Sequence, residues 1–342
     1  MEHNNRSEIL DVLKGILIIA VVIGHVASCK NIELDNNIPF LLCYSWHMFL
    51  FMGVSGYLCG KSKKENRGWI VKRIKRLMVP LIAWAIVSSI LDKDLSINRI
   101  FVYIFINPVY WYLFVQFVYE FIYFYCSKLR NKYLQIMCII CIGVGFAFVY
   151  KYIIACESIR QVLLYFPFYY GGLIISKHNE IKRSIDKVKW CSLFLYPISM
   201  IFYTWKDYTR VNEIITVMLQ HMNVDSSAIT KIIDMGMKGG YKIYNHYIVS
   251  PLGCAFYVCL AIIICCVSHD IYIRKVLAYI GENTMYIYIL HKYFVASMLK
   301  LTNSIILSTI MVVIICIIIT TIVKKMEIID AIFFGGKKLQ ER

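Results

Sequence analysis

Acidic residues, proline and long hydrophilic segments are scarce in this 342-residue chain. It has 21 Asp or Glu against 37 Lys or Arg, and its 6 prolines fall in no Pro- or Gly-rich linker. Because neither a linker nor an internal repeat of about 20–50 residues is present, we expect no appended soluble domain and no solenoid. Several signatures of soluble enzymes are also absent, namely G-x-x-x-x-G-K-[ST], G-x-G-x-x-G, H-E-x-x-H and G-x-S-x-G.

Long apolar runs are abundant instead. Hydrophobic residues make up 59% of the chain and the mean hydropathy is +0.63, whereas soluble domains are about 45–50% apolar. Several runs approach the ~20 residues that cross a bilayer, and the short alternating segments of a β-barrel do not occur. We therefore predict an all-α polytopic membrane protein, one membrane domain over 1–342 with ten spans. Their expected ranges are 12–28, 39–59, 77–91, 102–125, 134–155, 162–176, 190–205, 251–268, 277–296 and 304–323.

The basic residues set the expected orientation. A net charge of +16 could suggest a nucleic-acid partner, but the Lys and Arg residues gather in short loops between the spans. Residues 61–76 alone hold eight of them against one Glu, and a cytoplasmic N-terminus places 25 of the 37 on the cytoplasmic side. We therefore predict a bacterial cytoplasmic-membrane protein with both termini inside, an extracytoplasmic loop at 206–250, and no nucleic-acid partner.

The thirteen cysteines do not form a metal-binding pattern. Cys138 and Cys141 make one C-x-x-C pair, with no second pair and no histidine at zinc spacing. Cysteine in an apolar span behaves as a small hydrophobic residue. We therefore predict no metal site.

Three ionisable residues mark the first apolar run as the centre of the site. Lys14 and His25 are eleven residues apart, which is nearly a whole number of helical turns, so they share a face about 16 Å apart along the axis. Asp11 lies near the same face. Ionisable groups inside a span are costly and point to function, and a histidine is a candidate base near neutral pH. The alternative is a His25 that only hydrogen-bonds a neighbouring helix.

Arg73 and Arg76 open the third predicted span and are three residues apart, so they project from one side of a helix. Two guanidinium groups on one side suit a phosphate-bearing ligand. They equally suit a topology anchor that contacts lipid headgroups, and from the pattern alone the anchor is favoured.

Polar and aromatic residues in three other spans are further candidates. His47 is expected level with His25, either lining the same cavity or lying at the interface beside Trp46. Trp111 is typical of the aromatic belt. Gln116 and Glu120 are four residues apart in the same span, and a buried Glu120 requires a cationic partner, either Lys14 or an Arg.

The ninth predicted span carries a polar stripe of Thr284, Tyr288 and His291, at helical spacing. Asn283 immediately precedes this stripe. Such stripes line sites, and they also arise from ordinary hydrogen bonding between helices.

In their order along the chain, these pieces resemble the acyltransferase 3 family of integral membrane acyltransferases. The resemblance covers essentially the whole chain. It is carried by Lys14-x10-His25 with Gly24, His47-Met48-Phe49-Leu50-Phe51 with Ser55-Gly56-Tyr57, Arg73-x-x-Arg76 with Pro80, Trp111-Tyr112-Leu113, and Gly281…Thr284…Tyr288…His291. Phe49 and Thr284 depart from the family's usual Pro and Ser, and we expect none of the extracytoplasmic hydrolase-like domain that some members carry.

The resemblance implies transfer of an acyl group, usually acetyl, from acetyl-CoA or another acyl-CoA in the cytoplasm. The implied acceptor is a hydroxyl of a cell-surface glycan or its lipid-linked precursor, and the best placement is among sugar O-acetylases similar to fucose 4-O-acetylases. Membrane lipids are further partners. The implied roles are His25 as general base with Lys14 and Asp11 beside it, Arg73 and Arg76 on the coenzyme A phosphates, and His47, Trp111, Asn283 and His291 as substrate-binding residues.

Some alternatives stay open at this point. Lys14 is expected either near the pantetheine or paired with Asp11. Both direct transfer and a covalent acyl-enzyme are open, and direct transfer is favoured because no Ser or Cys is clearly activated. A transporter or flippase of lipid-linked sugars is the rival class, although the sequence shows no paired repeats or broken helices. Membrane-bound O-acyltransferases also use a buried histidine, but they do not account for Lys14 and the two arginines.

Overall fold

The computed structural model describes residues 2–30, 32–62, 67–106, 110–153, 156–205, 240–267 and 271–336, with a few isolated positions in 206–239. Every regular element in these ranges is helical. The chain forms two compact units. Unit 1 comprises Met1–Phe51 and Glu180–Ile317, unit 2 comprises Met52–Asn179 and Ile318–Arg342, and the boundaries fall inside α3, after the first residue of α10 and inside α17.

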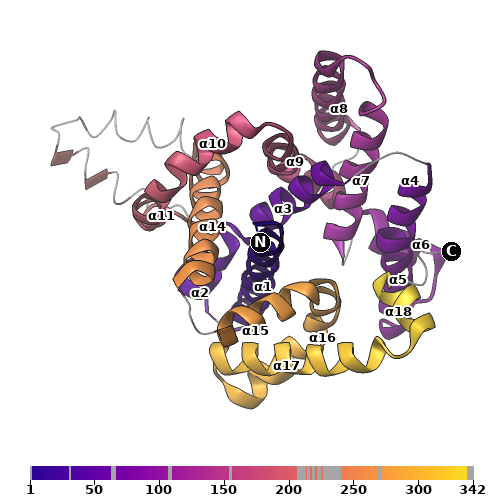
Figure 1. The fold of residues 1–342 in the computed structure, drawn as a ribbon. Helices are drawn as coiled ribbons and strands as arrows, with labels where there is room; N and C mark the ends of the chain where they lie inside the picture. The colour runs from indigo at the N-terminus through magenta and orange to yellow at the C-terminus, as the bar shows by residue number, and fades with distance from the viewer. Residues whose placement is uncertain are drawn as a thin grey trace. The chain divides into compact units, whose positions relative to one another are not determined.

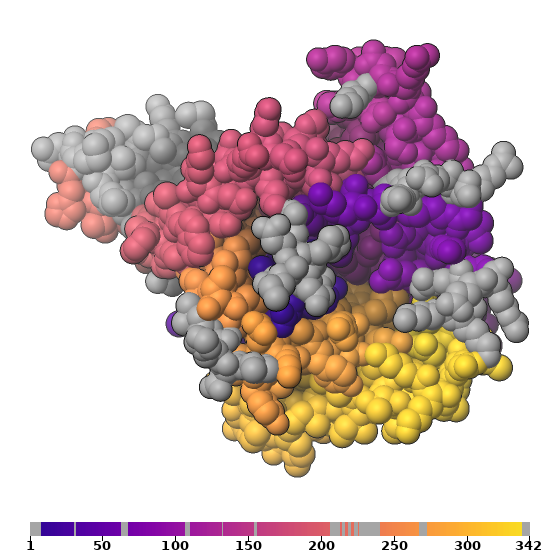
Figure 2. Space-filling model, in the orientation of Figure 1, coloured from indigo at the N-terminus to yellow at the C-terminus, as the bar shows by residue number. Residues whose placement is uncertain are grey.

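Unit 1 is built around the first helix, α1. Its elements are α1 (Glu2–Ser28), η1 (Leu34–Asn36), α2 (Ile38–Tyr44), the start of α3 (His47–Lys61), α10 (Asn179–Val188), η4 (Lys189–Cys191), α11 (Ser192–Met200), the π-helical turn η5 (Asn245–Val249), α14 (Ser250–Val267), α15 (Ile271–Glu282), α16 (Thr284–Thr302) and most of α17 (Ile305–Val323). Helix α1 packs against α2, α14, α15 and α16 (Figure 1). In the space-filling view, orange atoms of this unit lie directly against the indigo atoms of α1 (Figure 2).

Two glycines allow the closest of these contacts, between α1 and α15. A Cβ on Gly15 would overlap the carbonyl oxygen of Leu277, and a Cβ on Gly281 would overlap that of Asp11. Small residues at helix crossings let backbones approach closely inside membranes. Gly281 of the family-like motif therefore serves helix packing, and it brings the start of α16 close to α1.

Unit 2 contains the arginine motif. Its elements are the rest of α3, α4 (Arg67–Arg73), the π-helical turn η2 (Ile74–Met78), α5 (Val79–Leu91), α6 (Ile97–Phe101), the π-helical turn η3 (Val102–Ile106), α7 (Trp111–Cys126), α8 (Lys132–Tyr152), α9 (Glu157–Lys177) and α18 (Glu327–Phe334). Helix α18 packs on α5, where Trp84 Nε1 donates a hydrogen bond of 2.8 Å to the carbonyl of Phe333. Gly56 of α3 packs on the Tyr169 carbonyl of α9 at a distance that leaves no room for a Cβ.

The predicted membrane class is confirmed in the described part of the chain, which has six helices long and apolar enough to span a bilayer, or seven if one bent pair is counted as one span. These are Glu8–Ser28, Ile38–Lys61, Gly68–Leu91, Tyr133–Tyr152, Gly240–Cys266, Ile305–Val323 and the pair Ile97–Ile106 with Trp111–Cys126. The predicted spans 162–176, 190–205 and 277–296 fall on helices outside this set, and α11 within the second of them has only 9 residues.

Helix boundaries differ from the predicted spans at three places. The candidate span that includes Arg73 and Arg76 begins at Gly68 rather than at residue 77. Basic residues are tolerated at its start because their long side chains can extend from a helix end toward water. The candidate span Gly240–Cys266 begins within the predicted loop 206–250, and most of that loop lies outside the described residues.

The third difference is a helix break at Asn283, where one continuous span was expected over 277–296. The Asn283 side chain donates a 2.7 Å hydrogen bond to the carbonyl of Tyr279, four residues earlier. The backbone N–H of Asn283 therefore donates to the carbonyl of Ile280, three residues earlier, in place of the usual helical partner. Asparagine side chains compete with the backbone for such carbonyls. The polar stripe therefore begins at the start of a new helix, α16.

Candidate active site

The first predicted site residues lie on α1 in unit 1. Lys14 Nζ lies 2.5 Å from Asp11 Oδ1, one helical turn away, and each side chain is 25% exposed. Of the two arrangements expected for Lys14, the pair with Asp11 is the one present. Lys14 lies about 16 Å from His25 along the helix axis, at 1.5 Å per residue.

His25 stands near the C-terminal end of α1 and is exposed, although the helix around it is apolar. Its ring centroid lies 4.9 Å from that of His291 on α16, and the ring planes are inclined at 44°. His291 is only 4% exposed, and its Nδ1 lies 3.0 Å from the carbonyl oxygen of Ile287. A histidine that reaches accessible space is suited to exchange a proton with a substrate, whereas its buried neighbour is not.

Tyr44 and His47 lie beside this pair. The Tyr44 ring centroid is 6.2 Å from that of His25 and 5.0 Å from that of His47. His47 is 3% exposed and donates a 2.5 Å hydrogen bond from Nδ1 to the carbonyl of Cys43. The structure thus brings three predicted residues, His25, His47 and His291, into one group with Tyr44, which we call the histidine cluster.

The sequence interpretation did not single out Tyr44. The available signal is its spacing three residues before His47, which places neighbouring side chains together on a helical path. Tyr44 reaches His25 because Gly24 has no side chain, since a Cβ there would come within 2.8 Å of the tyrosine ring. Gly24 of the family-like Gly24-His25 pair therefore makes room for the cluster.

Asn283 lies at the α15–α16 break and is completely buried. Its side chain supports the backbone of Tyr279, and the neighbouring Thr284 Oγ1 donates to the Gly281 carbonyl at 2.5 Å. These bonds hold the start of the helix that carries His291. The substrate-binding role of Asn283 stays a prediction.

The arginine motif lies in unit 2, and Arg73 there is engaged by a buried carboxylate. Arg73 Nε lies 3.0 Å from Glu120 Oε2, with side-chain exposures of 18% and 1%. Gln116 Nε2 donates a 3.0 Å hydrogen bond to the other oxygen of Glu120, and the Arg73 guanidinium also lies over Trp69, 5.0 Å from the ring centroid. Glu120 therefore has an Arg partner, one of the two kinds that the sequence left open.

Arg76 differs from Arg73, because its side chain is exposed and no carboxylate among the described residues lies within ion-pair distance of it. Leu77 and Pro80, which follow Arg76 closely in the chain, are buried and hold this part of the chain in the protein interior. Of the two arginines, Arg76 is the one whose charge is available to a ligand phosphate or a lipid headgroup.

Trp111, also predicted to bind substrate, packs within unit 2. Its ring stacks on Tyr165 with centroids 5.0 Å apart and planes inclined at 10°. The adjacent Tyr112 shares a 2.7 Å hydrogen bond with Ser55 of α3. These contacts join α7 to α9 and α3, and the binding role of Trp111 stays a prediction.

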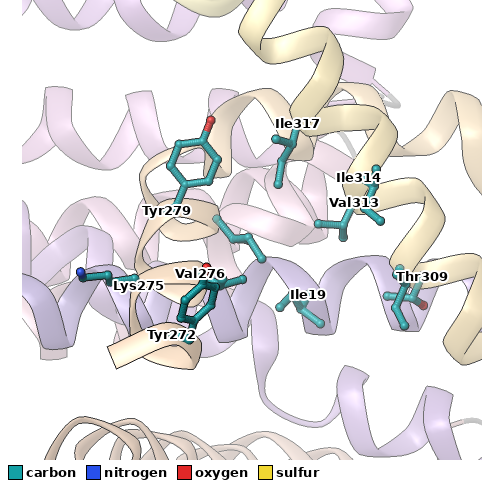
Figure 3. Close-up of a pocket in the computed structure, with 11 residues that line it drawn as sticks. Ile19, Tyr272, Lys275, Val276, Tyr279, Thr309, Val313, Ile314 and Ile317 are labelled. Atoms are coloured by element: carbon teal, nitrogen blue, oxygen red, sulfur yellow. The ribbon is translucent and has the colours of Figure 1, made fainter. Parts of the chain in front are cut away.

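An apolar cavity of about 750 Å³ lies in unit 1. Figure 3 shows side chains of α1, α15 and α17 around it, including Ile19, Val276 and Val313. The eleven lining residues are mostly aliphatic or aromatic and include none of the predicted site residues. Such a surface suits hydrocarbon, not a sugar or a phosphate, because polar groups buried without partners are costly. The cavity therefore does not coincide with any of the predicted site residues.

Comparison with known proteins establishes the family. Residues 8–324 match the acyltransferase domain of the acyltransferase 3 family, and the chain belongs to this family. The family prediction is thereby confirmed, and with it the general class of chemistry, acyl transfer.

Two curated relatives match part of the chain. The nodulation protein NolL of Sinorhizobium fredii is 34% identical over 87 residues, which cover 24% of this chain and 24% of the relative. The NolL protein of Mesorhizobium japonicum is 33% identical over 87 residues, which cover 24% of this chain and 23% of the relative. The matches thus span about a quarter of the relatives' length. No solved structure matches the chain.

Proposed function

We propose that this protein transfers an acyl group, most simply acetyl, from an acyl-coenzyme A to a hydroxyl of a cell-surface glycan or its lipid-linked precursor. The observation that carries the proposal is the accessible His25 in an apolar helix, beside the buried His291. Membership of the acyltransferase family supports the reaction class.

The reaction proceeds by direct transfer in this proposal. The unprotonated nitrogen of His25 removes the proton of the acceptor hydroxyl as its oxygen attacks the thioester carbonyl carbon. The new C–O ester bond forms and the C–S bond breaks. The coenzyme A thiolate leaves and takes up the proton from His25, which restores the neutral imidazole. The products are the ester and free coenzyme A, so the step needs no oxidant or other reagent.

The donor is held through its charged end in this scheme. Arg76 contacts the coenzyme A phosphates, whereas Arg73, three residues earlier, is held by Glu120 and Trp69 and keeps this part of the motif in place. We further propose that both termini are cytoplasmic, because the basic segments flanking the spans follow the positive-inside rule. The donor then approaches from the cytoplasm.

The decisive experiment is the substitution His25→Gln in the full-length protein. Glutamine keeps hydrogen bonding but cannot take the proton, so ester formation should fall by the ~10²–10⁴-fold typical of general-base catalysis. Membranes carrying the variant are given [14C]acetyl-CoA, and alkali-labile label in the glycan fraction is measured per amount of protein.

His178→Gln is the matched control, because His178 follows α9, is exposed and is not a member of the histidine cluster. Its ester formation should equal that of the wild type. If His25→Gln keeps more than about a tenth of the wild-type rate, the loss is smaller than the ~10²-fold lower end of the general-base range. His25 would then not be the base.

A further inference from the structure

The tautomer of His291 is defined by its surroundings. Its Nδ1 lies 3.0 Å from the carbonyl oxygen of Ile287, and a carbonyl oxygen can only accept a hydrogen bond, so Nδ1 carries the proton. In a neutral imidazole the other nitrogen, Nε2, is then an acceptor. This Nε2 is buried and has no hydrogen-bond partner among the described residues.

A buried acceptor without a partner is costly, so an unpaired Nε2 in a residue that is 4% exposed requires an explanation. Among the described residues, the aromatic ring nearest to His291 is that of His25, 4.9 Å away between centroids, and Tyr288 follows at 6.2 Å. Catalytic hydrogen bonds are often long or poorly aligned without substrate and tighten when it binds. Rotation of the more exposed His25 ring can bring one of its nitrogens to Nε2.

We propose that His291 is a positioning residue for His25, accepting the N–H of the His25 ring on its Nε2. This bond keeps the proton of neutral His25 on the nitrogen that faces His291. The opposite nitrogen of His25 is thereby the unprotonated one, and it faces the accessible side where the acceptor hydroxyl binds. A third group that orients a general base in this way is a recurrent arrangement in enzymes. His291 then acts through His25 rather than on the substrate.

The His47 ring provides a contrast within the same cluster. Its Nδ1 also donates to a backbone carbonyl, that of Cys43. The aromatic contact recorded between His47 and the rest of the cluster goes through Tyr44, 5.0 Å away, whereas His291 contacts His25 directly. The direct contact assigns the positioning role to His291.

This inference rests on the proposed function, and two substitutions at one position test it. His291→Gln keeps an acceptor oxygen near the place of Nε2, whereas His291→Leu removes it at similar size. In membranes supplied with [14C]acetyl-CoA, His291→Leu should lower kcat about 10–100-fold, the range seen when the partner that orients a histidine ligand is removed. The KM for acetyl-CoA should change less than about twofold, because uniform donor binding is not affected.

Rescue by the conservative variant separates positioning from a structural role. His291→Gln should recover to within about threefold of the wild-type kcat, because its amide oxygen accepts the same hydrogen bond. Abundance and Tm in detergent are measured for both variants. Equal loss of kcat in both, or a loss in His291→Leu that follows protein abundance, overturns the inference.

A double variant tests whether His291 acts through His25. In the His25→Gln background, His291→Leu should produce no further loss, since residues acting as a unit are not additive. A further drop of tenfold or more, about 1.4 kcal/mol, means that His291 acts independently. If wild-type membranes form no ester, or His25→Gln is fully active, the proposed function fails. If His25→Gln is inactive and His291→Leu is fully active, the positioning role alone fails.

Discussion

Arg73 Nε lies 3.0 Å from Glu120 Oε2, and the carboxylate is almost completely buried, with 1% of its side chain exposed. Gln116 binds the second carboxylate oxygen. An arginine in a buried ion pair has a structural role, because it neutralises a buried charge, whereas an exposed arginine does not. The two members of the Arg73-x-x-Arg76 motif therefore differ in kind, and they should fail differently when replaced.

Arg73→Ala should destabilise the protein, because it leaves the Glu120 charge buried without its cation. Breaking a buried pair in this way typically costs about 3–5 kcal/mol. The expected result is a lower Tm of the detergent-solubilised protein. The double variant Arg73→Ala/Glu120→Gln removes both charges and should regain much of that Tm. A double variant as unstable as the single one would show that the buried charge is not the cause.

Arg76→Ala should instead raise the KM for the acyl donor at nearly unchanged Tm, since Arg76 is exposed and has no carboxylate partner among the described residues. Hydrogen bonds to charged groups are worth about 1.5–3 kcal/mol, so we expect a KM roughly 10–100 times higher. Lysine at this position should rescue only partly, because the bidentate fork is lost.

Lys72→Ala is the matched control for Arg76→Ala. It removes one exposed positive charge from the same stretch of helix without touching the motif. Equal changes in donor KM for the two variants would mean that general charge attracts the donor, and Arg76 would then be a topology anchor.

Gly281→Ala should disturb the packing of α1 on α15, because the new Cβ meets the Asp11 backbone rather than a flexible side chain. Overpacking of this kind typically costs about 1–3 kcal/mol. The measurement is Tm in detergent, with Gly171→Ala as the control, since a Cβ there meets nothing within 4 Å. The control should be as stable as the wild type or slightly more stable, because alanine favours a helix. A Gly281→Ala protein as stable as the control would contradict the packing argument.

The proposed orientation predicts which loops a membrane-impermeant thiol reagent reaches. In a background without native cysteines, Asp225→Cys should be labelled from outside intact cells, and Lys64→Cys should be labelled only after permeabilisation. The physical reason is the positive-inside rule applied to 61–76, with eight basic residues and one acidic residue. The reverse pattern would overturn the orientation and place the donor on the wrong side.

Much of the membrane architecture was predictable, because the tendency to enter a bilayer is a summed property of neighbouring residues. The apolar windows that predict spans at 12–28, 39–59 and 304–323 coincide with helices that pass the length and hydropathy test. The family was predictable for a related reason, since Lys14-x10-His25 and Arg73-x-x-Arg76 are local spacings. The helix break at Asn283 could not be predicted in this way. The polar stripe keeps its helical spacing through α16, and the break depends on a side-chain hydrogen bond from Asn283 to the Tyr279 carbonyl.

By itself the sequence determined the class of protein and most of the apolar spans, and it singled out His25 as the candidate base, all from local patterns. Only the tertiary structure decided which residues share an environment. It paired Glu120 with Arg73, joined Lys14 to Asp11, and set His291 against His25 with Tyr44 beside them. Side-chain contacts between distant segments follow from how helices pack, and that packing depends on features such as Gly15 and Gly281, whose role becomes visible only when two backbones meet.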